Sequence, residues 1–387
     1  MAERPLRLAV VGMSTSPTCG ARDHALLLAR ALEHERVSCS LHWLAREHES
    51  LRAAHAEIHG WTRTLAEELA RERPDAVLLH YSSFSFAYRG VPLYLRPTLS
   101  ALHRCSVPLV SFMHEFAYPW RAGDWRGNVW AATQRAALID LMRASQAAVL
   151  TTDFRVDWLA SRWWLARRPM AIAPVFSNLP APTATGAPAP EPPRERRLVG
   201  LFGYSFQGAA TALVLDALRS LLETGVDVRL RLLGAPGRAS GAGQSWLAEA
   251  DARGLSDALS FTDTLPAGEL SNELAACELL LSVDPPGPTS RKGTLAASLA
   301  SGRPVIAIDG PRSWSELTAA DAAIVVAPTS GALAGAIAEL LADEPRREAL
   351  GARGRAFAER RMSVEHSAEV VAGLLRELLG AQPSAAA

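Results

Sequence analysis

Two adjacent cations precede a short run of small and apolar residues in the second half of the chain. Arg291 and Lys292 follow a proline-rich turn, and we expect them to stand in the first turn of a helix. Cations are normally disfavoured at the positive amino end of a helix, so a bound anion is one explanation for the pair. Helix amides over 290–294, a guanidinium and an ammonium together predict a diphosphate site. The alternative is a solvated pair that hydrogen-bonds to loop carbonyls.

A histidine and a glutamate end the segment LVSFMHE, in which a buried strand is predicted over Leu109–Met113. Ligands bind at the carboxyl ends of parallel strands, and an imidazole can donate to or accept from a sugar hydroxyl or a phosphate oxygen. His114 and Glu115 are therefore candidate catalytic residues. The aromatic residues that follow either stack on a sugar-like or apolar acceptor or simply pack an irregular loop: Phe116, Tyr118, Trp120, Trp125 and Trp130.

Two further turns place glycines between a predicted strand and a predicted helix. In GMSTSPTCGARDH, the backbone amides after Gly20 favour an anion, although an ordinary turn with Asp23 as helix cap explains the segment equally well. In GLFGYSFQG, Gly203 is followed by the hydroxyls of Tyr204 and Ser205 but by no lysine or arginine. Charge for a phosphate at this second turn must come from elsewhere in the chain.

Composition and missing motifs exclude several other functions. Lysine plus arginine and aspartate plus glutamate number 40 each, so no global positive field indicates a nucleic acid partner. The sequence has no dinucleotide glycine fingerprint, no phosphate loop and no nucleophile elbow. It also lacks the Asp-x-Asp motif that binds a metal and a sugar nucleotide, so no metal is predicted. The four cysteines lie far apart, and we expect reduced, buried thiols.

The apolar segments of the sequence bear on its location. The amino-terminal apolar run is too short for the core of a signal peptide, and no stretch of about 18 apolar residues occurs, so a cytoplasmic protein is expected. The tryptophans and arginines of 153–169 leave peripheral membrane contact open, although a mostly packed helix is the commoner outcome.

Short apolar runs alternate with amphipathic stretches along the chain, which is typical of βαβ units and parallel sheets. A proline-rich segment interrupts this pattern and predicts a linker over 180–197. We therefore predict an α/β protein with two Rossmann-like, doubly wound parallel-sheet domains facing each other across a cleft that holds the ligand. The predicted parts are an acceptor-side domain 1–179, the linker, a nucleotide-sugar-binding domain 198–361, and a C-terminal helix with a frayed tail over 362–387.

From end to end, the sequence resembles GT-B-fold glycosyltransferases of the family 4, or group 1, type. In the second half the resemblance rests on VRLRLLG, GLSDALSFTDTLPAGELSNELAACELLLSVD, SGRPVIA and ELTAADAAIVVAP, which follow the family's order of strands, turns and helices. In the first half it rests on CGARDHALLLARAL, on the strand ending in His114 and Glu115, and on PVFSNLP.

The resemblance implies a hexosyltransferase that moves a sugar from a nucleotide diphosphate donor, usually with retention and without an obligatory metal or other cofactor. The acceptor class stays open between a small molecule, a glycan and a lipid-linked compound. It also implies that His114 contacts the donor sugar and that the helix 363–379 crosses back onto the first domain. Candidate donor residues are Gly20, Gly203, Tyr204, Ser205, Leu265, Thr289, Ser290, Gly293 and Thr294, and candidate acceptor residues are Asp23, His24, Tyr118 and Trp120.

The sequence departs from the family pattern around the donor loop. Two glutamates typical of the family fall at Thr289 and Ala297 in the register of SGRP, and neither position is acidic. The usual arginine and lysine after the first strand of the second domain are missing too, and our hypothesis is that Arg291 and Lys292 restore that charge. These losses keep open a catalytically weak or inactive protein that binds a nucleotide sugar or a partner chain. A NAD-dependent oxidoreductase is disfavoured by the missing glycine fingerprint.

Overall fold

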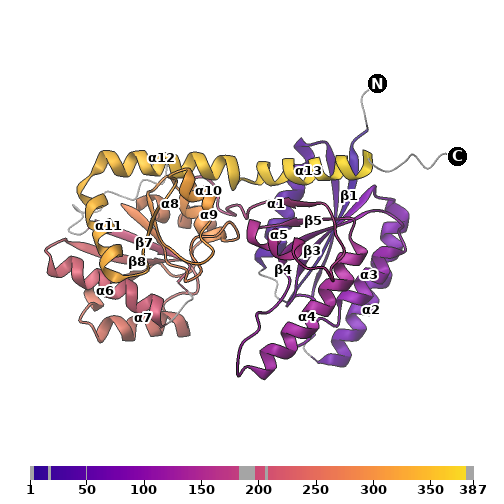
Figure 1. The fold of residues 1–387 in the computed structure, drawn as a ribbon, viewed down its shortest axis with the longest axis horizontal. Helices are drawn as coiled ribbons and strands as arrows, with labels where there is room; N and C mark the ends of the chain where they lie inside the picture. Colours follow the sequence, from indigo (N-terminus) through magenta and orange to yellow (C-terminus); the bar gives the residue numbers. More distant parts are fainter. Residues whose placement is uncertain (1–3, 16–18, 49, 183–196, 205–207, 381–387) are drawn as a thin grey trace. The chain divides into compact units, whose positions relative to one another are not determined.

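The chain divides into two compact units, which are described separately (Figure 1). Unit 1 comprises Met1–Pro174 together with Val364–Ala387, and unit 2 comprises Val175–Ser363. Most of the predicted linker and the predicted frayed tail lie outside the described residues. The computed structural model describes residues 4–15, 19–48, 50–182, 197–204 and 208–380.

Unit 1 is built on six parallel strands in the order β2-β1-β3-β4-β5-β6. The four inner strands are buried along almost their whole length. Strands of a parallel sheet that is covered on both faces are apolar throughout, which explains the unbroken apolar runs in the sequence. The strands are β1 Leu6–Ser14, β2 Val37–Ala45, β3 Ala76–Ser82, β4 Leu109–Glu115, β5 Ala147–Leu150 and β6 Met170–Ile172.

The last described helix belongs to unit 1 although it follows unit 2 in the sequence. It packs on the first helix of the chain, where the Arg376 guanidinium donates to the Glu35 carbonyl at 2.7 Å. At its other end, the Ser367 hydroxyl donates to the Pro174 carbonyl at 3.3 Å. The helices of unit 1 are α1 Gly20–His34, α2 Leu51–Glu72, α3 Leu95–His103, α4 Trp125–Ala144, α5 Asp153–Ala160 and α13 Val364–Gly380.

Unit 2 repeats the architecture with six parallel strands in the order β12-β11-β10-β7-β8-β9. The strands are β7 Arg197–Phe202, β8 Val228–Leu233, β9 Leu259–Phe261, β10 Leu279–Ser282, β11 Val305–Ile308 and β12 Ile324–Val326. The helices are α6 Ala209–Glu223, α7 Gly241–Asp251, α8 Ala267–Ala276, α9 Gly293–Ala300, α10 Ser315–Ala319, α11 Ser330–Ala342 and α12 Glu344–Arg361, with a 3-10 turn over Ser256–Ala258.

The strand order has the same functional consequence in each unit. In unit 1 the first strand lies between β2 and β3, and in unit 2 β7 lies between β10 and β8. At such a switch point the following connections leave in opposite directions, and open parallel sheets bind ligands there, at the carboxyl ends of the strands. The two Rossmann-like sheets confirm the predicted α/β fold class.

Several local expectations need correction. Helix α1 begins at Gly20 with Cys19 as N-cap, so Asp23 lies within the first turn and does not cap the helix. Helix α9 begins at Gly293, so the two cations precede its first turn instead of standing in it, and Lys292 is the N-cap residue. All four cysteines are free thiols, but only Cys277 is fully buried and the other three are partly exposed. Among the described residues, no helix combines the length and apolar character needed to cross a bilayer.

Candidate active site

The two turns predicted to hold the donor diphosphate meet in unit 2. Gly203 directly follows β7 and has φ of +84°. A Cβ at this position would lie 2.7 Å from Cγ2 of Thr294, in the first turn of α9. Both the left-handed backbone and the close approach exclude a larger residue. The glycine therefore brings the end of β7 against the amino end of α9.

Lys292 forms an ion pair at the amino end of α9. Its Nζ lies 2.7 Å from Oδ1 of Asp284, two residues beyond the end of β10. The side chains of Lys292 and Asp284 are 34% and 19% exposed, so solvent reaches the ammonium. The carboxylate holds this cation beside the backbone amides that open α9, and Arg291 precedes it in the same turn.

The residues before the two cations are buried. Thr289 and Ser290 are 4% and 2% exposed, and the Thr289 hydroxyl has no hydrogen-bond partner among the described residues. The Ser290 carbonyl accepts a hydrogen bond of 2.8 Å from the amide of Val175. A Cβ on Gly293 would lie 3.7 Å from Cγ1 of Val175. The first residues of unit 2 therefore pack against this turn.

The other predicted donor residues differ in what they can reach. The Tyr204 ring is fully buried, and its hydroxyl donates to the Gly234 carbonyl at 3.0 Å while accepting from the Gly237 amide at 2.8 Å. Tyr204 therefore fixes the neighbouring turn through its hydroxyl, in place of the predicted donor contact. Ser205 lies outside the described residues. Leu265 is partly buried and packs against an apolar cluster of unit 2.

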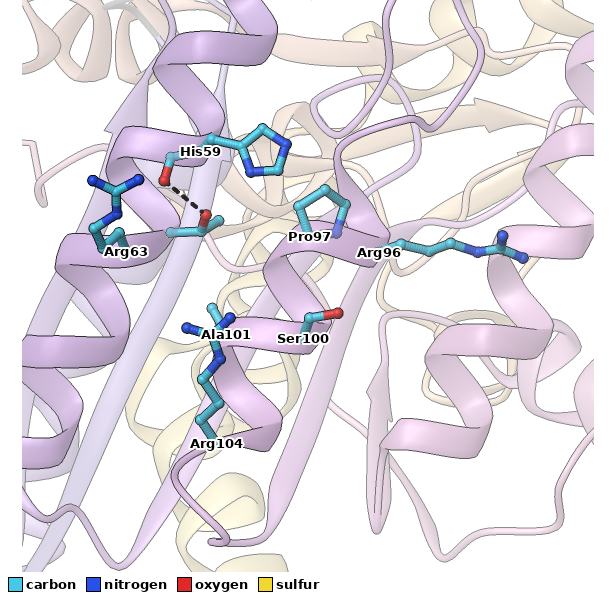
Figure 2. A pocket seen from close by; sticks show the side chains of 8 residues that line it. His59, Arg63, Arg96, Pro97, Ser100, Ala101 and Arg104 are labelled. Atoms are coloured by element: carbon cyan, nitrogen blue, oxygen red, sulfur yellow. Dashed lines mark hydrogen bonds between the residues drawn. The ribbon is translucent and has the colours of Figure 1, made fainter.

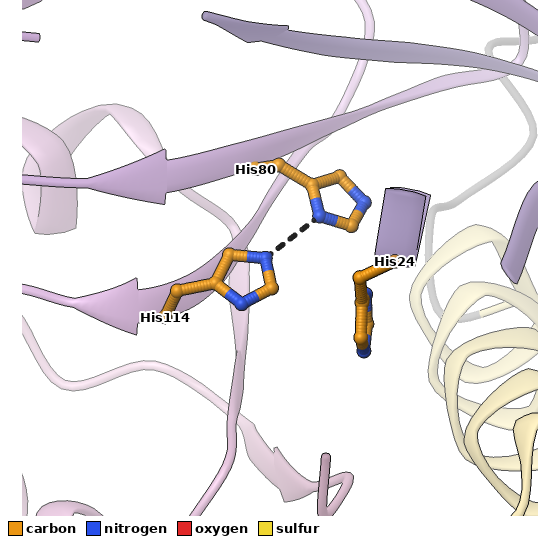
Figure 3. A group of neighbouring side chains, drawn as sticks. All are labelled: His24, His80 and His114. Atoms are coloured by element: carbon orange, nitrogen blue, oxygen red, sulfur yellow. Dashed lines mark hydrogen bonds between the residues drawn. The ribbon is translucent and has the colours of Figure 1, made fainter. Parts of the chain in front are cut away.

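In unit 1, three histidines come together where two strands end (Figure 3). His80 lies in β3 and His114 in β4, and Nδ1 of His80 is 3.0 Å from Nε2 of His114. His24, from α1, has its ring centroid 5.0 Å from that of His114 and 5.8 Å from that of His80. His24 and His80 are buried, and His114 is partly exposed.

The sequence predicted roles for His24 and His114 but missed His80. Its signal was present, because the predicted strand Ala76–His80 ends in it and the next predicted strand ends next to His114. Neighbouring parallel strands end at the same edge of a sheet, and β3 does pair with β4. The sequence alone does not show that β3 pairs with β4.

All three imidazoles are neutral near pH 7. Burial lowers the pKa of His24 well below its usual value, with smaller contributions from His114 and His80. Burial also lowers the pKa of His80 well below its usual value, followed by an effect of His114. Burial and the positive charge of Arg155 lower the pKa of His114 to about 4. The ring nitrogens are therefore available as acceptors or as metal ligands.

Arg155 and Glu115 lie next to this cluster. The Arg155 guanidinium, from α5, donates to the His114 carbonyl at 2.5 Å and to the Thr151 hydroxyl at 3.2 Å. Glu115 is the last residue of β4, is partly buried, and its carbonyl accepts from the Ser83 amide at 3.1 Å. The strand end that carries the histidine and glutamate is therefore fixed from both sides.

The predicted donor residue Gly20 and the predicted acceptor residues Asp23, Tyr118 and Trp120 do not share one environment. Gly20 and Asp23 are exposed at the amino end of α1. The Tyr118 ring packs edge-on against Trp130 at 5.4 Å between centroids, which favours the loop-packing interpretation. Trp120 is 57% exposed with the Arg135 guanidinium 4.9 Å from its ring, which leaves its outer face for a ligand.

A separate pocket of about 420 Å³ lies between α2 and α3 (Figure 2). Arginines border it, with Arg63 from α2 and Arg96 from α3, and Arg104 directly after α3. Arg96 is already paired with Asp140 at 2.6 Å. None of the predicted site residues lines this pocket, so it is distinct from the strand ends described above.

Comparisons with known proteins agree with this architecture. Residues 197–343 match the model of the family described as "Glycosyl transferases group 1". None of the proteins with curated descriptions matches the chain. A glycosyltransferase from Rickettsia africae has the same fold, with 11% identity, a TM-score of 0.72, and coverage of 98% of this chain and all of that one.

Two other solved structures extend the comparison. Anabaena Alr3699/HepE, solved in complex with UDP and glucose, has 14% identity to this chain and a TM-score of 0.67. The match covers 96% of this chain and all of the Anabaena chain. A UDP-N-acetylglucosamine 2-epimerase has 11% identity and a TM-score of 0.58, and covers all of this chain and 99% of its own. The fold alone thus hosts both transfer and epimerisation, whereas the family model specifies transfer. Residues 197–343 therefore match a group 1 glycosyltransferase domain, and the chain as a whole has the two-domain fold of these structures.

Proposed function

We propose that the chain transfers a sugar of the hexose class from a nucleotide diphosphate donor bound by unit 2. The observation that carries this proposal is the ion pair of Lys292 with Asp284 beside the contact of Gly203 with Thr294. A partly exposed cation, a glycine turn and the first amides of α9 lie together there, inside the range that matches the group 1 family. These are the groups that bind a diphosphate.

The same groups supply a mechanism for departure of the nucleotide. As the sugar leaves, negative charge develops on the diphosphate, and preorganised amides and cations stabilise that charge. Lys292 exchanges its carboxylate partner for a phosphate oxygen, and Arg291 adds a guanidinium that can bind two oxygens at once. The side chains thus take the part that a divalent metal has elsewhere, so we propose transfer without a metal.

On the acceptor side, the proposed groups are those at the strand ends of unit 1. His114 contacts the donor sugar, while Glu115, Asp23 or His24 orients or deprotonates the acceptor hydroxyl. Among the described residues we assign none as a nucleophile for double displacement, so we propose attack on the same face as the leaving group, with retention. Trp120 offers an exposed aromatic face for a small molecule, a glycan or a lipid-linked acceptor. We propose a cytoplasmic location.

A second candidate function is a protein that binds a nucleotide sugar without turning it over. The observation favouring it is that the two positions where the family carries glutamates hold Thr289 and Ala297, which have no carboxylate and are each 4% exposed. Binding through the diphosphate alone would then remain, with weak or no catalysis. Fold cannot decide between the two, because function depends on the site.

Calorimetry with UDP, GDP, TDP and NAD, combined with mass spectrometry of the matching sugar nucleotides, separates these functions. Diphosphate binding with acceptor-dependent loss of the sugar supports transfer. Binding without any change of the donor supports the non-catalytic protein. Conversion of a UDP-sugar to its epimer without an acceptor, or binding of NAD alone, would contradict both. A screen of donors with lysate acceptors, analysed by intact mass, then identifies the acceptor.

A further inference from the structure

The proposed transfer gives roles to His24 and His114 but does not explain why a third histidine, His80, lies with them. His24, His80 and His114 each offer a ring nitrogen, and these nitrogens lie within 4.8 Å of one another. Buried polar atoms are normally hydrogen-bonded, yet Nε2 of His80 has no partner among the described residues. Three imidazoles whose ring nitrogens converge form a donor set for a ligand that accepts lone pairs.

We propose that His24, His80 and His114 form a binding site for a transition metal ion of the zinc class. Three imidazoles with a fourth position open to water or substrate is a donor set that proteins use for zinc. Of the three residues, His114 is the one that is partly exposed. The inference rests on unit 1 alone and does not depend on how unit 2 binds a donor.

The geometry is close to that of a bound ion. Zinc–nitrogen bonds of about 2.1 Å at tetrahedral angles place ligand nitrogens roughly 3.4 Å apart. The pair His80 and His114 is already at 3.0 Å, so ligation requires mainly an approach of His24 by somewhat more than about 1 Å. Figure 3 shows the His24 ring beside the other two and nearly perpendicular to the His114 ring, with an interplanar angle of 86°.

Ligation needs no net loss of a proton. The hydrogen bond between His80 and His114 has one ring nitrogen as donor and the other as acceptor. A neutral imidazole can carry its proton on either nitrogen, so a change of tautomer frees both lone pairs for the metal. The cost on the protein side is the loss of this hydrogen bond, together with a proton placed on Nε2 of His80, which has no partner among the described residues.

The surroundings select the kind of metal. The donor set contains no oxygen ligand, which disfavours magnesium and calcium, while imidazole suits zinc, copper and nickel. The positive charge of Arg155, whose guanidinium is bonded to the His114 carbonyl, opposes any cation. Only a metal that forms strong bonds to nitrogen overcomes this repulsion, which again favours the zinc class.

A second pair of histidines must be controlled in any test. His55 and His59 lie one turn apart on α2, with their Nε2 atoms 2.9 Å apart and exposed. Such a pair can chelate a metal adventitiously. The double variant His55→Ala with His59→Ala therefore removes two histidines from an exposed helix face and serves as the matched control.

The test is titration of the tag-free, EDTA-treated full chain with Zn²⁺ and Co²⁺, with metal content measured after dialysis. We expect one Zn²⁺ per chain, visible absorption of tetrahedral Co²⁺, and no competition from Mg²⁺. The His55→Ala, His59→Ala variant should bind equally well. His24→Gln, His80→Gln and His114→Gln should each weaken binding by at least about 100-fold, beyond the 10–100-fold typical of losing an outer-shell partner.

Three outcomes would overturn the proposal. One is a wild-type chain that binds neither Zn²⁺ nor Co²⁺, which would leave a hydrogen-bonded imidazole pair without a metal. Another is loss of binding in the control variant, which would assign the metal to α2. The third is unchanged binding in any of the three glutamine variants. If one of these fails to fold, as judged by circular dichroism, the wild-type and control titrations still decide.

Metal binding and transfer can also fail independently. A chain that binds Zn²⁺ but releases no sugar from any donor would sustain the metal site and contradict the proposed function. Transfer by an EDTA-treated chain that takes up no Zn²⁺ on titration would sustain the proposed function and contradict the metal site.

Discussion

Gly203 and Thr294 are so close that a Cβ on the glycine would lie 2.7 Å from the threonine Cγ2. The relationship joins the end of β7 to the first turn of α9 and so shapes the proposed diphosphate site. We predict that Gly203→Ala destabilises the fold by about 1–3 kcal/mol through steric overlap and the left-handed backbone. Diphosphate affinity should fall at least tenfold, measured by calorimetry after denaturant unfolding has established the folded fraction.

The threonine provides the control for this prediction. Thr294→Ser removes Cγ2 and keeps the hydroxyl, so the double variant Gly203→Ala with Thr294→Ser should recover part of the stability. The backbone strain of alanine at φ of +84° would remain. No recovery at all would show that steric contact with Thr294 is not the reason for glycine at this position.

We predict that the Tyr204 hydroxyl stabilises the fold and does not take part in nucleotide recognition. Tyr204→Phe leaves the Gly234 carbonyl and the Gly237 amide without the hydroxyl that bridges them. Leaving buried polar groups unpaired costs about 1–3 kcal/mol, so the denaturant midpoint should fall. The Kd for nucleoside diphosphate, corrected for the folded fraction, should stay within about threefold. A Kd that rises tenfold with unchanged stability would restore the hydroxyl to the donor site.

Asp75 makes part of the stability of unit 1 dependent on pH. Burial raises the pKa of its carboxyl, but hydrogen bonds from the Arg4 guanidinium and the Arg7 amide outweigh this and lower the pKa below 3.8. The unfolded state therefore binds a proton first on acidification, so the stabilisation is present above about pH 4 and is lost as the pH falls through the folded pKa.

Asp75→Asn tests this linkage by calorimetric Tm measurements. The variant should melt a few degrees below wild type near about pH 6. The effect is modest because the Arg4 side chain of the ion pair is 65% exposed. The difference should shrink toward about pH 3, where the wild-type carboxyl becomes protonated as well. A constant difference across this range would mean that Asp75 acts by packing and not through its charge.

The sequence predicted the two sheets well, because parallel strands are continuous apolar runs separated by amphipathic helices. Strand ends were less accurate, since β4 extends through Glu115 and so includes both predicted catalytic residues. The start of α9 was also misplaced, because Lys292 caps the helix from outside and its charge is held by Asp284. That pairing comes from a turn eight residues earlier in the sequence, and no local pattern reveals it.

Long-range pairing also explains what the sequence did not reveal about His80 and Tyr204. His80 becomes a neighbour of His114 only when β3 pairs with β4, and of His24 only when α1 packs on the sheet. The sequence suggested that the Tyr204 hydroxyl contacts the donor. In the structure this hydroxyl is bonded to Gly234 and Gly237, which lie in the loop after β8. Contacts of this kind depend on the fold and not on residue spacing.

The central claim is that the cations before α9 bind the donor diphosphate, and its most direct test is calorimetry with UDP and GDP on Arg291→Ala with Lys292→Ala. The matched control is Arg219→Ala with Arg346→Ala, which removes two cations of unit 2 whose side chains are each 48% exposed. Each charge-assisted hydrogen bond is worth about 1.5–3 kcal/mol, so the account predicts at least a hundredfold loss of affinity in the first variant and little change in the control. Equal affinity in wild type and in the Arg291→Ala, Lys292→Ala variant would contradict it.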